Sequence, residues 1–195
     1  MESQARLILA SGSPYRREQL ARLRVPFTVE AAQIEEMPGA QEVPEETAGR
    51  LAREKAAAVA ERHAAGLVIG SDQVAALDGL ILGKPGTPAR AREQLSRCSG
   101  RTVSFLTAVC VIDAASGTRQ EALEPVSVRF RELDPETIGR YVEADEPLDC
   151  AAALRSEGLG AALLESVESR DPSALIGLPL IALCRMLREL GHPLP

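Results

Sequence analysis

Aromatic residues are scarce in this chain of 195 residues, amounting to 3%, and tryptophan is absent. Stacking platforms for single-stranded nucleic acid need several exposed rings, so this mode of binding is largely excluded. Charge of one sign is not concentrated either, because the formal net charge is -6 and no block of five like charges occurs. We therefore expect neither a nucleic acid nor an anionic membrane surface as a partner, and any anionic ligand must be held by a few individually placed cations.

Histidine and cysteine are also few, with two and four residues, and no two cysteines form a CxxC pair. A structural zinc site is therefore not expected, and His63 and His192 leave little for a Ser-His-Asp or Cys-His mechanism. The cysteines are interpreted as small core residues in a reducing compartment. If a metal acts, carboxylates must hold it, which favours a hard cation such as Mg2+ or Mn2+.

Long hydrophobic runs are missing as well. No segment approaches the roughly 18 apolar residues of a membrane span, and the apolar run near the start is too short for a signal peptide. A cytoplasmic location follows by default. What the chain does contain is 45% hydrophobic residues with no internal repeat and no linker. This composition predicts a single unit, residues 1–195, of two lobes that share a cleft.

The first informative stretch, residues 7–17 (LILASGSPYRR), predicts a strand, a turn and a helix. Such a turn presents backbone N–H groups at the positive end of a helix, where an anion is favoured. Ser11 and Ser13 add hydroxyl donors, and Arg16 with Arg17 offers guanidinium forks suited to phosphate oxygens. The pattern favours a phosphate cradle about as much as the alternative, in which a serine only caps the helix and both arginines are solvated.

A second informative stretch, residues 66–74 (GLVIGSDQV), predicts a buried strand that delivers Asp72 and Gln73 at its carboxyl end. Asp72 is a candidate general base or metal ligand, the alternative being a turn residue, and Gln73 can read a base edge. A turn at residues 78–79 then predicts a hairpin that brings Asp72 close to Lys84. A carboxylate beside an ammonium suits a site that activates water next to a polyphosphate.

Two more charged residues are candidates. Lys55 falls on or beside the apolar stripe of a helix expected over residues 44–64, where a lysine either snorkels outward, the commoner case, or points into a cleft to meet an anion. Glu36 follows Glu35 in an acidic pair between a strand expected over residues 27–32 and a turn. It could hold a metal or a water, although spacing alone favours a loop charge. The other expected elements are helices over residues 16–24, 88–96, 135–142 and 181–190, and strands over residues 80–82, 103–112 and 125–131.

Taken together, these stretches resemble the Maf family of nucleoside triphosphate pyrophosphatases over almost the whole chain. One such motif would be weak, but a series of seven in the family's order is specific. The motifs are SxSPxR at residues 11–16, the acidic pair at 35–36, LAxxKA at 51–56, a strand-end Asp72, GKP at 83–85, SG at 99–100 and GLPL at 177–180.

The resemblance implies a mixed α/β fold of the Maf/ITPase-like kind, with an elongated, curved mixed sheet flanked by helices, two lobes and a central cleft, often found as a homodimer. The implied reaction is hydrolysis of a nucleoside triphosphate between the α and β phosphates. In this reaction Asp72 acts as base toward the attacking water, and Glu36 helps Asp72 to hold a divalent cation. Which of the two carboxylates activates the water is left open. The groups that neutralise the triphosphate are then Ser11, Ser13, Arg16, Lys55 and Lys84.

Within the family, the chain resembles the branch that hydrolyses 7-methyl-GTP, on the residues SDQV at 71–74, CA at 150–151 and SEG at 156–158. It departs from that branch at residues 152–155 (AALR), where Gly, Ser, Phe and Lys are usual. Tyr15, Gln73 and Glu157 occupy the positions that discriminate bases. A carboxylate at Glu157 suits the donor edge and positive ring of 7-methylguanine, and Tyr15 can stack on that ring. The alternatives are a dTTP or UTP pyrophosphatase, a nucleotidyltransferase, and a nucleotide-binding regulator of cell division without turnover.

Overall fold

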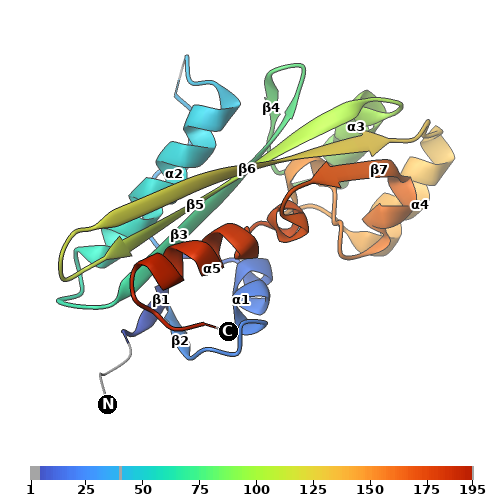
Figure 1. Cartoon of the computed structure of the whole chain (residues 1–195). Helices are drawn as coiled ribbons and strands as arrows, with labels where there is room; N and C mark the ends of the chain where they lie inside the picture. The colour runs from blue at the N-terminus through green and yellow to red at the C-terminus, as the bar shows by residue number, and fades with distance from the viewer. Residues whose placement is uncertain (1–4, 40, 195) are drawn as a thin grey trace.

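The computed structural model describes residues 5–39 and 41–194, and its strands form one mixed sheet (Figure 1). In this part of the chain the sheet has seven strands: β1 (Leu7–Leu9), β2 (Phe27–Val29), β3 (Leu67–Leu77), β4 (Leu80–Leu82), β5 (Thr102–Asp113), β6 (Arg119–Phe130) and β7 (Leu164–Ser169). Their order is β2-β1-β3-β5-β6-β7, with β4 paired to β3. β1 runs parallel to β2 and β3, whereas the other pairs are antiparallel.

Helices flank this sheet. The described residues form α1 (Pro14–Ala21), α2 (Pro44–Ala60), α3 (Pro88–Cys98), α4 (Pro135–Asp145) and α5 (Leu180–Glu189), with 3-10 segments η1 (Ala151–Ala153), η2 (Leu159–Leu163) and η3 (Pro172–Ile176). Four of the α-helices begin with proline, whose missing N–H costs nothing in the first turn. None of the helices in the described ranges is both long and apolar enough to cross a membrane.

Most expected elements are confirmed, and the differences have local causes. α1 begins at Pro14 and ends at Ala21, short of the expected residue 24, where Arg24 has a φ of 56°. β2 ends at Val29 instead of residue 32, because its partner β1 ends at Leu9. α2 ends at Ala60, four residues before the expected end. β7 was not predicted, since its sequence LESVES has few strand formers and is fixed by pairing with the edge of β6.

Helices gather at the two ends of the long β5–β6 hairpin and give the molecule two lobes (Figure 1). At one end α1 and α5 lie on one side of the sheet and α2 on the other. The core beneath α5 includes Ile69 and Leu183, and the core beneath α2 includes Ala52 and Val74. At the other end α3 and α4 pack around a separate core that includes Phe130. The expected two-lobed α/β fold with an elongated mixed sheet is therefore confirmed.

α2 packs very close to β3 at Gly70. A Cβ atom placed on Gly70 would lie 2.2 Å from Ala52 O and 2.6 Å from Ala56 N, closer than real Cβ contacts allow. Residues 70 and 72 share one face of β3 because side chains alternate along a strand. The missing side chain at Gly70 therefore lets α2 approach the face that carries Asp72.

Candidate functional site

The candidate site lies at a gap beside β3. β1 pairs with residues 67–69 of this strand and β4 with residues 75–77, while β5 takes the opposite edge. On the edge of β3 that β1 and β4 share, residues 70–74 therefore have no paired strand among the described residues. Asp72 lies here, in the middle of β3, so the prediction that it ends a strand was wrong. β3 continues past the gap because the hairpin with β4 extends it, and the strand that ends at this point is β1.

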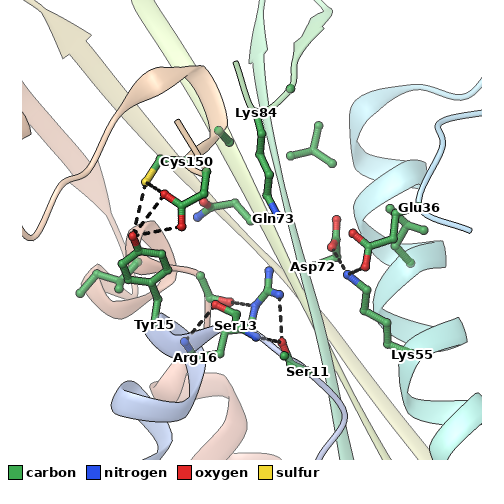
Figure 2. A pocket seen from close by; sticks show the side chains of 18 of the residues that line it. Ser11, Ser13, Tyr15, Arg16, Glu36, Lys55, Asp72, Gln73, Lys84 and Cys150 are labelled. Carbon is green, nitrogen blue, oxygen red and sulfur yellow. Dashed lines mark hydrogen bonds and ion pairs between the residues drawn. The ribbon is translucent and has the colours of Figure 1, made fainter. Parts of the chain in front are cut away.

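Lys55 and Asp72 form a buried ion pair on the α2 side of the gap (Figure 2). Lys55 Nζ donates to Asp72 Oδ1 at 2.7 Å, and the two side chains are 6% and 10% exposed. The same ammonium lies 2.9 Å from Glu36 Oε1, which the loop after β2 supplies. Burial raises the pKa of Glu36, but the surrounding positive charges, chiefly Lys55, outweigh it and hold the pKa below its ordinary value. Lys55 thus points into the cleft, and Glu36, whose side chain is 52% exposed, is a loop charge that pairs with Lys55.

The turn between β1 and α1 supplies the middle of the site. Ser13 Oγ caps α1 by accepting from Arg16 N at 3.4 Å, and Ser11 Oγ accepts from Arg16 Nη1 at 3.4 Å. Arg16 Nε donates to Gly177 O at 2.8 Å. In Figure 2 the guanidinium lies between the Lys55 group and Tyr15. Ser13 therefore does cap the helix, but Arg16 is anchored in the site and not solvated.

Tyr15 and its neighbours form the wall at the other end (Figure 2). The Tyr15 hydroxyl lies 3.4 Å from both carboxylate oxygens of Asp149, and Cys150 Sγ lies 3.9 Å from that hydroxyl. Burial raises the pKa of Tyr15 to about 12, and burial with Asp149 raises that of Cys150 to about 11. Both stay protonated at neutral pH. Cys150 and Cys184 are half-buried, so the interpretation of all four cysteines as core residues was wrong for these two.

Gln73 points to the opposite side of β3 from Asp72 and is held by η3. Its Nε2 donates to Thr107 Oγ1 at 3.0 Å and to the carbonyl oxygens of Ala174 and Leu175, both at 2.9 Å. The nitrogen end of the carboxamide is thus engaged by protein, and the carbonyl oxygen is left to meet a ligand.

Ten of the sequence-derived candidates line one cavity of about 620 Å3: Ser11, Ser13, Tyr15, Arg16, Glu36, Lys55, Asp72, Gln73, Lys84 and Glu157. Arg17 and Glu35 are not among its lining residues. Sequence reasoning missed Asp149, Leu175 and Ile176, which also line it, and it named Gly177 only as part of the GLPL motif. Asp149 stands in an irregular stretch without a recognisable pattern, and residues 175–177 read as an ordinary apolar core segment. The cavity is within the size range of small-molecule sites.

The carboxylates of Asp72 and Glu36 converge on the Lys55 ammonium, so positive charge is favoured between them. Two carboxylates completed by phosphate and water oxygens form the kind of donor set that Mg2+ takes. No group of three or more metal-binding His, Cys, Asp or Glu side chains occurs in residues 5–39 and 41–194. The residues present therefore fit a Mg2+ or Mn2+ ion that shares its coordination with a bound phosphate.

A family model described as Maf-like protein matches residues 6–190. The chain belongs to this family. Two similar proteins named 7-methyl-GTP pyrophosphatase support the assignment. The one from Ralstonia nicotianae is 54% identical over 188 residues, covering 96% of this Maf-like chain and 97% of that protein. The one from Pseudomonas aeruginosa is 53% identical over 189 residues, covering 97% of this chain and 98% of that protein.

The fold of this Maf-like chain also resembles a solved structure, protein VC0702 from Vibrio cholerae. The TM-score is 0.50 at 12% sequence identity, with 98% of this chain and 100% of that chain covered. At this identity the likeness concerns the fold alone, and it agrees with the mixed α/β architecture described above.

Residues 152–155, where this Maf-like chain differs from the pattern expected for the 7-methyl-GTP branch, include two residues with unusual backbone angles. Ala152 and Ala153 have φ angles of 52° and 54°, in the left-handed region that favours glycine. Both are fully buried, and the adjacent Leu154 lines the cavity. The backbone at residues 152 and 153 thus has a conformation that glycine adopts with less strain than alanine.

Proposed function

We propose that this protein is a nucleoside triphosphate pyrophosphatase that hydrolyses 7-methyl-GTP to 7-methyl-GMP and diphosphate, and so removes a modified nucleotide. The observation that carries the proposal is the convergence of a buried carboxylate–ammonium pair, an anchored guanidinium and a tyrosine wall in one cavity. The names of relatives that are 53% and 54% identical over nearly their full length support both the reaction and the substrate.

In the proposed mechanism Asp72 takes the proton from a water that attacks the α-phosphorus of the triphosphate. A new P–O bond forms to the water oxygen, the anhydride P–O bond breaks, and diphosphate leaves. Lys55 donates to Oδ1 of Asp72 and so orients this carboxylate. Charge that builds on the leaving group is stabilised by the cationic and hydroxyl groups around it, namely Ser11, Ser13, Arg16, Lys55 and Lys84.

The metal is part of the proposal, with Glu36 and Asp72 as the protein ligands. When bound, Mg2+ or Mn2+ neutralises phosphate charge and polarises the anhydride. The protein's own contribution is to hold the two carboxylates beside the phosphate cradle, and the lowered pKa of Glu36 favours the ionised form of that residue.

Base selection is proposed for the opposite end of the cavity. A cation over the face of a tyrosine ring is attracted by the ring's quadrupole, and 7-methylguanine carries such a positive charge. The position of the Tyr15 ring in the cavity wall supports this role. Gln73 and Glu157 then accept hydrogen bonds from the N–H groups of the base.

The test is diphosphate release from 7-methyl-GTP, GTP, dTTP, UTP and CTP with Mg2+, compared between the native chain and Asp72→Asn. We expect preferential turnover of 7-methyl-GTP and a loss of about 100-fold to 10,000-fold in kcat for Asp72→Asn, since the variant keeps the shape of the side chain but lacks the base. Asp113→Asn is the matched control, because Asp113 ends β5 far from the cavity, where its carboxylate accepts from the Ser116 hydroxyl.

The other outcomes separate the alternatives. Preference for dTTP or UTP keeps the reaction and overturns the roles given to Gln73 and Glu157. Binding without turnover overturns the enzyme and favours a regulator. Diphosphate release that requires a second substrate identifies a nucleotidyltransferase. Loss of turnover on chelation, with recovery on adding Mg2+ or Mn2+, tests the metal. Sedimentation of the intact chain tests the homodimer that the family resemblance implies.

A further inference from the structure

Thr107 lies behind the cavity wall, where it is fully buried and not among the lining residues. It pairs with Gln73 across the β3–β5 ladder. Its hydroxyl has two partners: Oγ1 donates to Ala174 O at 2.8 Å and accepts from Gln73 Nε2 at 3.0 Å. Thr107 thus connects the base-facing glutamine to the η3 segment.

This network fixes which end of the Gln73 carboxamide faces the ligand. The nitrogen end lies 2.9 Å from two carbonyl oxygens, those of Ala174 and Leu175, and carbonyl oxygens can only accept. A flipped carboxamide would place its oxygen against both of these acceptors. The hydroxyl of Thr107 has one hydrogen, which it already donates to Ala174 O. It would therefore have no hydrogen to donate to the flipped carboxamide oxygen of Gln73. The flipped orientation is therefore unfavourable on three counts.

We propose that Thr107 is a positioning residue for base recognition, which holds the nitrogen of Gln73 in the wall so that only its carbonyl oxygen faces the base. This inference rests on the proposed function. Together with the carboxylate of Glu157, the cavity then offers two acceptors and no side-chain amide donor from Gln73. A base must bring N–H donors on its edge, as guanine does with N1–H and its exocyclic amine. A base whose edge carries no N–H gains nothing from these contacts.

The experiment measures kcat and KM of the native chain, Thr107→Val and Thr107→Ser with two substrates. One is 7-methyl-GTP, and the other is the triphosphate of 7-methylpurine riboside, which keeps the methyl group and positive ring but has no N–H on its base. Valine has the shape of threonine without the hydroxyl. We expect Thr107→Val to lower the preference for 7-methyl-GTP by about twofold to tenfold, the effect of one or two lost hydrogen bonds. Thr107→Ser restores the preference, because it restores the hydroxyl.

A structural role alone would act on both substrates. If kcat/KM falls equally for the two nucleotides in Thr107→Val, or if serine does not restore the preference, the inference is wrong. Thr102→Val is the matched control, since Thr102 is an exposed residue at the start of the same strand. The proposed function fails separately, by absence of turnover in the native chain.

A second measurement needs no variant and no substrate. The side-chain amide protons of Gln73 are engaged with three acceptors, so in NMR of the free native chain we expect them to exchange with solvent more slowly than those of an exposed glutamine. Exchange at the rate of an exposed glutamine would contradict the fixed orientation, even if Thr107→Val failed to fold.

Discussion

Replacement of Gly70 by alanine tests whether the spacing of α2 and β3 sets the geometry of the site. The new Cβ would lie 2.2 Å from Ala52 O, and an ordinary contact begins at 3.4 Å, so the helix must retreat by 3.4 − 2.2 = 1.2 Å. The obstacle is backbone, which has no rotamer to change. Overpacking of this kind costs about 1–3 kcal/mol, or about 2–12 °C in Tm for a chain of this size. The same retreat would stretch the 2.7 Å contact between Lys55 and Asp72.

Two assays on Gly70→Ala follow from these magnitudes. Thermal unfolding should show the fall in Tm, and diphosphate release measured well below that Tm should fall about 100-fold, the typical effect of a 1 Å misplacement. Gly139→Ala is the matched control. Gly139 lies in α4 with nothing within 4 Å of an added Cβ, so alanine there should stabilise the helix by up to about 1 kcal/mol. Unchanged Tm and unchanged activity in Gly70→Ala would refute the argument from close packing.

Three further predictions concern charge. Arg50 lowers the pKa of Glu42 to about 2. The stability from this contact is therefore present above the ordinary pKa of 4.5 and lost as pH falls toward 2. In urea unfolding, the loss of unfolding free energy in Glu42→Gln relative to the native chain should shrink over that range. Lys55→Met should lower the free energy of unfolding by about 3 kcal/mol, because it leaves Asp72 buried and unpaired. Adding Asp72→Asn to this variant should restore part of the lost free energy, again measured by urea unfolding. With its pKa raised to about 11, Cys150 should react with iodoacetamide at pH 8 about tenfold more slowly than a thiol of ordinary pKa, as mass spectrometry of the labelled protein can follow.

Local chemistry explains which parts of the site could be predicted. The turn around Ser11 and Ser13 follows from an apolar run, small residues and a proline, all within a few positions of one another. The turn at residues 78–79 is equally local, and the hairpin it predicts is present. These segments are strand, turn and helix in the structure because short-range preferences decide them.

Features that depend on distant partners escaped prediction. Asp72 was expected at a strand end, but whether β3 continues depends on β4 and on pairing with β5. β7 exists because β6 offers an edge, and its own sequence gives little sign of it. The contact between Gln73 and Ala174 spans 101 positions, and no periodicity in either segment indicates the other. The direction of Lys55 was open for the same reason, since only the position of Asp72 decides it.

The hydrogen bond from Arg16 to Gly177 joins residues 161 positions apart. Closing so long a loop costs entropy before any contact rewards it, and the sheet strands between these residues must pair first to bring the ends together. We therefore expect the middle of the cavity to be completed late in folding. During synthesis a ribosome-bound chain can form β1, α1 and the β3–β4 hairpin well before residue 177 emerges, and the cradle stays open until then. We therefore expect catalytic competence to coincide with completion of the fold and not to precede it.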